Sequence, residues 1–230
     1  YMVFATRSLR PLNNPVLKFY VLTILIASLL VALSLKMSSA GFTWGDSFMT
    51  GIFQVVSFIS TTGFAISDNS TWPLFACFIT VLISIPCGMA GSTTGGVKSD
   101  RMFLIFKTIG QQIKNSIHPS SINQVHVGNH IMGSNEIYPH FVYFGLYFIT
   151  IAASIVLTVL SGMDIQNAFA SSVSFLSNVG PALEAQGTLG NYNAVPVFAK
   201  VVFIIDMFMG RVEIYPILAV VMMIFTGKKK

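Results

Sequence analysis

The sequence predicts an all-α polytopic membrane protein with two tandem helix–pore-helix–helix repeats and re-entrant filter loops. Three observations support this prediction. Only 9% of the 230 residues are charged and 53% are hydrophobic, whereas an ordinary soluble domain is about 25% charged. Several apolar stretches approach the roughly 20 residues that cross a bilayer. One unit of the sequence also occurs twice. A water-soluble fold of this size is therefore excluded, and the net charge of +5 is interpreted as a topology signal and not as a nucleic-acid-binding surface.

Four long apolar segments are expected to form transmembrane helices, near residues 16–36, 71–90, 138–161 and 193–226. The first three overlap the longest stretches that lack Asp, Glu, Lys and Arg. The fourth carries four charged residues, yet its apolar content still favours a single long helix.

Two shorter apolar stretches, near residues 46–60 and 164–177, begin at Asp46 and Asp164, just after a glycine-containing turn. Each ends in a glycine-bearing segment after about 14 residues, which is too short to span a bilayer and is typical of a re-entrant half-helix. Both aspartates suit a helix start, where an acidic group meets unpaired N–H groups and the positive end of the dipole. An interfacial or core helix remains the alternative at this point.

Positive charge predicts the orientation, because Lys and Arg concentrate in cytoplasmic loops. Ten of the 13 basic residues precede the first span, follow the second or follow the last: Arg7, Arg10, Lys18, Lys98, Arg101, Lys107, Lys114, Lys228, Lys229 and Lys230. Four acidic residues lie on the other side: Asp46, Asp68, Asp164 and Glu184. We therefore expect a multi-pass plasma-membrane protein with both termini of this segment cytoplasmic and the half-helices entering from outside.

An internal repeat appears when the sequence is compared with itself at a shift of 117 residues. VSFISTTGFA (56–65) then aligns with VSFLSNVGPA (173–182), with six identities in ten positions around a shared glycine. Such repeats in membrane proteins commonly form a pathway at their mutual interface.

The repeated segments favour cation passage, because non-helical backbone at membrane depth is tolerated only where it packs in protein or lines water. Carbonyl oxygens arranged around an axis can replace the hydration shell of potassium. Gly63 and Gly180 would allow the backbone angles that this arrangement needs. The predicted ion filter comprises Ser60, Thr61, Thr62, Gly63, Phe64, Ser177, Asn178, Val179, Gly180 and Pro181. Potassium is expected at Thr61, Thr62, Gly63, Asn178, Val179 and Gly180.

A glycine-rich segment follows the second predicted span, with glycines at positions 88, 91, 95 and 96. Each glycine costs about 1 kcal/mol in a helix interior, so the helix is expected to be interrupted there. The interruption could be an unwound loop beneath the filter or a simple helix end at the cytoplasmic surface.

The final segment contains Lys200, Asp206, Arg211 and Glu213. Charged residues inside a membrane usually face a cavity or pair with a partner. In one continuous helix, Asp206 and Glu213 would share a face. Lys200 and Glu213 are interpreted as interfacial or helix-pairing residues, and a structural ion pair remains an alternative for Arg211.

Four segments together are similar to the Trk/Ktr/HKT potassium transporter superfamily, most closely to its bacterial TrkH branch: STTGFA (60–65), SNVGPAL (177–183), GMAGSTTGGVKSDR (88–101) and MGRVEIYPIL (209–218). The resemblance implies potassium uptake through the two filter segments, with no cofactor. It also implies a gate formed by an intramembrane loop, with Arg211 projecting into the pore. The implied gate residues are Gly91, Ser92, Thr93, Thr94, Gly95, Gly96, Lys98 and Arg211.

The resemblance further implies four repeats in one polypeptide, whereas this sequence holds two that match the third and fourth. We therefore expect a first repeat at residues 1–117, a cytoplasmic loop at 118–137 and a second repeat at 138–230. The implied partners are N-terminal repeats of the same subunit, membrane lipid, a second subunit in a homodimer and a cytoplasmic nucleotide-binding regulatory ring like TrkA. No nucleic acid is expected to bind.

Two other function classes were weighed against this one. An ion-coupled secondary transporter of another cation, linked to sodium or protons, would explain broken helices and intramembrane acids but not the duplicated half-helix. A haem- or quinone-binding membrane anchor would need paired intramembrane histidines, yet all four histidines lie within residues 118–140. No catalytic constellation is apparent, so an enzyme is not expected.

Overall fold

A computed structural model describes residues 13–38, 41–118, 125–127, 130–183, 186–188 and 190–226. Several residues that carry the charge asymmetry lie outside these ranges: Arg7, Arg10, Glu184, Lys228, Lys229 and Lys230.

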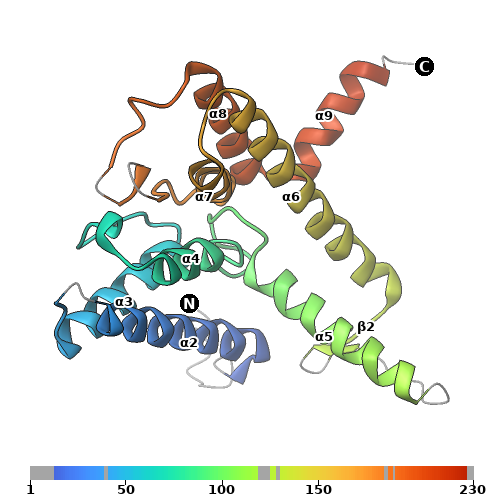
Figure 1. Cartoon of the computed structure of the whole chain (residues 1–230). Helices are drawn as coiled ribbons and strands as arrows, with labels where there is room; N and C mark the ends of the chain where they lie inside the picture. The colour runs from blue at the N-terminus through green and yellow to red at the C-terminus, as the bar shows by residue number, and fades with distance from the viewer. Residues whose placement is uncertain are drawn as a thin grey trace.

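The first half of the chain folds as a long helix, a short helix and a second short helix that pack on one another (Figure 1). These elements are α2 (Pro15–Met37), α3 (Trp44–Ile59) and α4 (Leu74–Ile83). A 3₁₀ turn, Asn69–Thr71, precedes α4. The segment between α3 and α4 contains the first predicted filter.

The second half repeats this order (Figure 1). It consists of α6 (Ser134–Leu160), α7 (Ile165–Leu176), α8 (Val197–Val212) and α9 (Ile214–Thr226). Helices α6, α7 and α8 pack pairwise, and α4 meets α7 where the two halves join. The main buried core runs through both halves, from Val31 and Phe58 to Tyr147 and Leu176. A smaller cluster surrounds Phe203 of α8.

The two halves are joined by α5 (Ser99–Ile117) and a small antiparallel hairpin. The hairpin strands, β1 (Val125–Val127) and β2 (His130–Met132), lie in the segment that the sequence predicted as a loop. Two three-residue strands do not change the fold class, which is a helical membrane fold as predicted.

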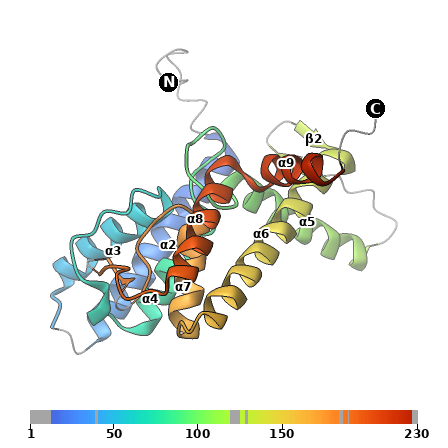
Figure 2. The same ribbon diagram turned by 90° about the horizontal axis from the view of Figure 1, so that it is seen from above.

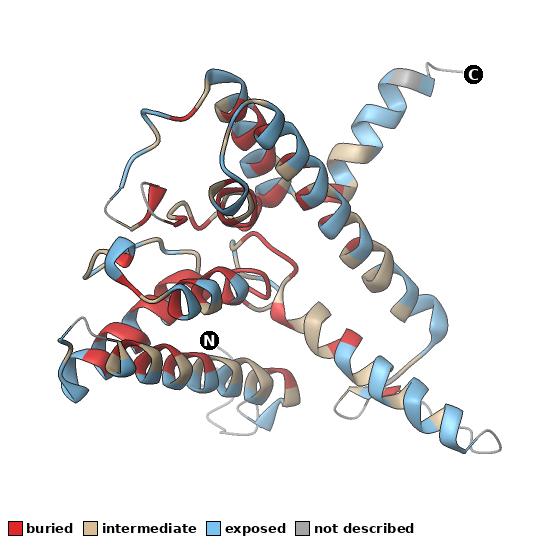
Figure 3. Ribbon diagram, viewed as in Figure 1, coloured by how far each residue is buried: buried red, intermediate tan, exposed pale blue. Residues whose placement is uncertain are grey.

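Two helices in the described part of the chain, α2 and α6, are long and apolar enough to cross a membrane. The bent pair α8 and α9 counts as a third if the two helices are taken as one span. Many large apolar side chains of these helices are exposed. Their positions fall on the pale blue stretches of the ribbon in Figure 3. Such faces suit contact with lipid.

The predicted span at 71–90 is wrong in extent, because α4 covers only Leu74–Ile83. Pro86 lacks an N–H and its ring would clash with the carbonyl of Leu82 in a continuing helix. Ser84 therefore closes the helix, and Cys87 follows with a φ of 45°. The chain leaves the helix before it reaches the first of the glycines.

The predicted single helix at 193–226 is also wrong, because the chain bends by 110° between α8 and α9 (Figures 1 and 2). Glu213 lies at the break with a φ of 69°. Pro216 explains the position of the break, because in an unbroken helix its ring would clash with the carbonyl of Val212. Asp206 and Glu213 consequently do not share a helix face.

The two short helices form where the sequence predicted them. Asp164 caps α7 and accepts a hydrogen bond from the Gln166 N–H at 3.0 Å. Asp46 lies in the first turn of α3, one turn beyond the true cap, Thr43. Thr43 Oγ1 accepts from the Asp46 N–H and donates to the Asp46 carboxylate at 2.6 Å. The re-entrant placement of both helices in a bilayer stays a prediction.

Candidate functional site

The carboxyl ends of α3 and α7 are closed by the same hydrogen bonds, 117 residues apart. In each turn, the second residue after the helix donates to the carbonyl three residues back, and the third donates to the carbonyl five residues back. The four bonds are Thr61 to Phe58 (3.0 Å), Asn178 to Phe175 (3.0 Å), Thr62 to Ser57 (2.9 Å) and Val179 to Ser174 (2.9 Å). The repeat seen in the sequence is therefore also a repeat of backbone geometry.

Both turns contain alternating residues with positive φ. Thr61 and Asn178 have φ values of 52° and 62°, and Gly63 and Gly180 have values of 75° and 103°. A β-branched residue such as Thr61 rarely adopts this conformation, so the surrounding bonds must impose it. Residues 60–66 and 177–183 are accordingly not wound as ordinary helix.

One serine in each short helix ties the following loop back to the helix. The Ser57 hydroxyl donates to the Phe64 carbonyl at 2.6 Å, and the Ser174 hydroxyl donates to the Pro181 carbonyl at 2.5 Å. Both serines are buried. The sequence analysis did not identify either serine as a site residue. Their shared place in the repeated Val-Ser-Phe segment was the signal that could have identified them.

The two predicted filter segments contact one another directly. A β-carbon added to Gly63 would lie 2.6 Å from the Val179 carbonyl oxygen, closer than real carbon–oxygen contacts. No atom lies within 4 Å of a β-carbon added to Gly180. The Gly180 carbonyl accepts a hydrogen bond from Tyr192 at 3.0 Å, which leaves a second lone pair available.

The other predicted filter residues lie in two different environments. Ser60 and Thr62 share a hydrogen bond between their hydroxyls at 2.7 Å, on an open face that also includes Phe64. Ser177 is fully buried, and its hydroxyl pairs with that of Tyr147 at 2.8 Å. The two loops therefore repeat in backbone path but not in side-chain exposure.

Asn178 connects the second filter segment to the glycine-rich segment and to α8. Its amide nitrogen lies 2.8 Å from the β-carbon position of Gly95 and even closer to that of Gly210. Among the described residues this buried nitrogen has no hydrogen-bond partner. Only residues without a side chain at 95 and 210 leave room for it.

The glycine-rich segment between α4 and α5 is a closed loop with a largely buried base, drawn red in Figure 3. Its two ends are held together by the Val97 N–H on the Ile85 carbonyl and the Ser99 N–H on the Gly88 carbonyl, both at 3.0 Å. Gly95 packs against the second predicted filter segment, because a β-carbon there would lie 2.6 Å from the Ser177 carbonyl. The predicted interruption is therefore an ordered loop beside that segment and not a simple helix end.

The tip of this loop carries the polar residues of the predicted gate. Ser92 and Thr94 share a hydroxyl hydrogen bond at 2.7 Å, and Gly91 is exposed with a φ of 84°. The Thr93 carbonyl accepts a hydrogen bond from the Arg211 guanidinium. The structure thus brings Arg211 to the loop, 118 positions away in sequence.

Charged residues clamp the base of the loop to the break in the final helices. Glu213 pairs with Lys98 at 2.9 Å and with Arg101 at 2.8 Å. The Arg101 guanidinium lies 3.9 Å from the centre of the Tyr143 ring, and the Tyr143 hydroxyl donates to the Gly96 carbonyl at 3.3 Å. Lys98 and Glu213 both have positive φ, so the ion pair joins the two strained helix junctions.

Asp206 has a separate, structural environment in the packing of α6, α7 and α8. It is 3% exposed and accepts a hydrogen bond from the Ser154 hydroxyl at 2.5 Å. Ser154 also pairs with Ser172 at 2.9 Å. Lys200 donates to the Asn193 carbonyl at 3.1 Å. Neither charge reaches the glycine-rich loop.

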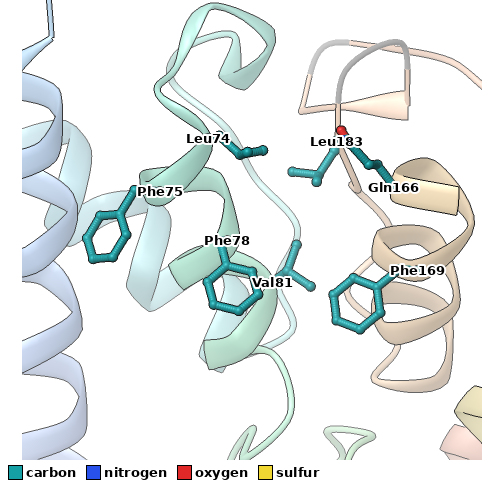
Figure 4. A pocket seen from close by; sticks show the side chains of 7 residues that line it. All are labelled: Leu74, Phe75, Phe78, Val81, Gln166, Phe169 and Leu183. Atoms are coloured by element: carbon teal, nitrogen blue, oxygen red, sulfur yellow. The ribbon is translucent and has the colours of Figure 1, made fainter.

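An apolar cavity of about 440 Å³ lies where the two halves meet (Figure 4). Phe78 and Val81 from α4 lie opposite Phe169 from α7. The cavity has almost no polar lining, and none of the predicted filter or gate residues contributes to it. It is therefore an unsuitable path for a hydrated ion.

Comparison with known proteins supplies independent information. A family model described as "TrkH: Cation transport protein" matches residues 14–228. The Trk system potassium uptake protein TrkH of Escherichia coli (strain K12) is 32% identical over 181 residues, covering 79% of this chain and 36% of the relative. The protein TrkG of the same strain is 29% identical over 222 residues, covering 95% of this chain and 44% of the relative.

The crystal structure of the potassium transporter TrkH from Vibrio parahaemolyticus is similar in fold. It matches with a TM-score of 0.85 and 26% sequence identity over 95% of this chain and 47% of that chain. The chain thus spans less than half the length of each of these three relatives.

Proposed function

Because the chain belongs to the TrkH family of cation transport proteins, we propose that it forms part of a potassium uptake pathway across the bacterial inner membrane. The resemblance noted in the sequence is confirmed at the level of the family. The transported ion, the filter and the gate are our proposals for this chain.

One observation carries the proposal: the duplicated turn after α3 and α7, with matching backbone bonds and positive-φ positions. In this proposal, carbonyl oxygens of residues 61–63 and 178–180 replace water around a dehydrated potassium ion. The negative ends of the α3 and α7 dipoles favour a cation at the same place. Sodium is smaller, and it would gain less from oxygens held at potassium distances.

Two filter segments do not surround an ion, so we propose that further repeats of the same subunit complete the ring. The pattern of contacts supports this. Gln166 and Phe169 of α7 face α4 across the apolar cavity. Their equivalents 117 residues earlier, Met49 and Ile52 of α3, line an open groove beside the first filter. A helix equivalent to α4 from another repeat would cover that groove.

The glycine-rich loop is proposed as the gate. It packs against Ser177 and Asn178 of the second filter, and its tip is held by Arg211. Displacing the loop would open space next to the filter. The positive charge of Arg211 in that space would oppose cation leakage.

The proposal is tested by flux measurements on the native protein reconstituted in phospholipid vesicles. Potassium permeation well above sodium permeation is expected. The variant Gly180→Ser should lower the potassium-to-sodium ratio about threefold to tenfold, because a positive-φ residue with a side chain is strained by about 1–3 kcal/mol. Equal permeation of both ions by the native protein would overturn the proposed function.

Neutralising Glu213 should release the proposed gate. Glu213→Gln removes both ion pairs, and partly exposed pairs contribute about 0.2–1 kcal/mol each. Together, two such pairs favour the closed state of the gate over its open state by a factor of about five. We therefore expect a several-fold higher basal potassium flux, measured in the same vesicles, with the potassium-to-sodium ratio unchanged.

The control for this variant is Asp46→Asn, which removes an exposed carboxylate charge from the first turn of α3 but keeps an oxygen that accepts from the Thr43 hydroxyl. Its basal flux should match that of the native protein. An unchanged flux in Glu213→Gln, with normal protein recovery, would contradict the role of the charged clamp.

A further inference from the structure

The loops that follow the two filters are bridged by a reciprocal pair of hydrogen bonds. The Asn69 N–H donates to Thr188 Oγ1 at 3.0 Å, and the Thr188 N–H donates to Asn69 Oδ1 at 2.9 Å. The Thr188 hydroxyl in turn donates to the Ser67 carbonyl at 2.7 Å. The partners are 119 residues apart in sequence, so the bridge joins one repeat to the other.

Asn69 extends the bridge to the end of the second filter. Its amide nitrogen donates to the Ala182 carbonyl at 2.9 Å, within a fully buried environment. Ala182 is itself fixed, because its N–H donates to the Gln186 carbonyl at 2.8 Å. Asn69 is 2% exposed, and its side chain has both its oxygen and its nitrogen engaged across the repeat boundary.

The bridge lies very close to both proposed filters in sequence. Ala182 follows Gly180 by two positions, and Ser67 follows Gly63 by four. The bonds from Ser57 and Ser174 attach each loop to its own helix. The bridge instead attaches the two loops to one another, on the side where each chain leaves its filter.

We propose that Asn69 and Thr188 are positioning residues that set the separation of the two filter loops and thereby the preference for potassium. This inference rests on the proposed function. Carbonyl cages distinguish ions through the number and spacing of their oxygens. Without the bridge, no hydrogen bond between described residues joins the two loops, so they can relax toward a smaller ion about the contact of Gly63 with Val179.

The test compares isosteric and conservative variants in the native protein in vesicles. Thr188→Val removes the hydroxyl that bonds Asn69 and Ser67, so two of the hydrogen bonds that join the loops are lost. The potassium-to-sodium permeability ratio is expected to fall several-fold, with total flux largely retained. Thr188→Ser keeps the hydroxyl and should keep the ratio. Asn69→Ala removes the bridge from the other side and should reproduce the fall.

The matched control is Thr71→Val, the same substitution at the equivalent position of the first repeat. The Thr71 side chain is exposed, and its hydroxyl bonds only within its own turn, to the Asp68 carbonyl. Its permeability ratio should equal that of the native protein.

Three outcomes are informative. A native protein that does not prefer potassium refutes the proposed function itself. A selective native protein with unchanged ratios in both Thr188→Val and Asn69→Ala refutes only the positioning role. If Thr188→Val and Asn69→Ala yield no folded protein, the test compares Thr188→Ser with the double variant Asn69→Gln and Thr188→Ser. The glutamine lengthens the bridge, so the double variant must differ from Thr188→Ser in its permeability ratio if the inference is correct.

Discussion

Replacing Gly63 with alanine is expected to lower the potassium-to-sodium permeability ratio at least about tenfold. Two costs coincide at this position. The φ of 75° strains any residue with a β-carbon, and that carbon would lie 2.6 Å from the Val179 carbonyl oxygen. Val179 cannot move freely, because its N–H is bonded to Ser174. The strain alone amounts to about 1–3 kcal/mol, and the clash pushes one filter against the other. Flux ratios in vesicles provide the measurement.

Gly41→Ala is the matched control for this prediction. Gly41 also has a φ of 75°, but no atom lies within 4 Å of its β-carbon position. It therefore carries the same backbone strain without the contact and should leave the permeability ratio unchanged. A Gly63→Ala protein that is as selective as the Gly41→Ala protein would show that the two loops do not act together.

The short helices could be predicted because their signals are local. Asp164 follows a glycine-containing turn, and its side chain caps α7 as expected. For α3 the same reasoning identified the helix but not its first residue, because the capping side chain is Thr43 and Asp46 supports it from inside the first turn. The paired glycines and the 117-residue repeat likewise located both turns.

The helix breaks were mispredicted because hydropathy does not detect them. Residues 84–87 carry no charge and continue the uncharged stretch that begins before α4, so the pattern extended the span to residue 90. The informative residue was Pro86, not the later glycines. Pro216 was the corresponding signal for the break at Glu213. In both places the apolar sequence continues, but the helix ends because a proline ring cannot fit inside it.

Long-range pairings could not be predicted from local patterns. Glu213 meets Lys98 and Arg101 across more than a hundred residues, and Asn69 meets Thr188 across a similar interval. These contacts depend on how the two repeats pack. The positive φ of Thr61 could not be predicted either, because threonine disfavours this conformation and the surrounding hydrogen bonds impose it.

Replacing Gly210 with alanine is expected to reduce potassium flux at least about tenfold and to lower the melting temperature of the purified protein. A β-carbon at Gly210 would overlap both the Leu176 carbonyl oxygen and the Asn178 amide nitrogen. Overpacking a tight core costs about 1–3 kcal/mol, and here the obstacle is backbone that cannot rotate away. Alanine is more favourable than glycine in a helix by only about 1 kcal/mol, which does not offset this cost. We therefore expect α8 to move away from α7.

The outward shift of α8 has a specific consequence, because the next residues hold the proposed gate. Arg211 would separate from Thr93, and Glu213 from Lys98, which alone would release the proposed gate. The expected loss of flux therefore comes from the second filter segment, because the clash at Leu176 and Asn178 displaces its carbonyl oxygens, and this effect outweighs the release of the gate. Gly145→Ala in α6 provides the comparison: it is also a helical glycine, but no atom lies within 4 Å of its β-carbon position. That variant should be as active as the native protein and slightly more stable. Equal flux and melting temperature in Gly210→Ala and Gly145→Ala would mean that α8 does not pack against the end of α7 in the membrane.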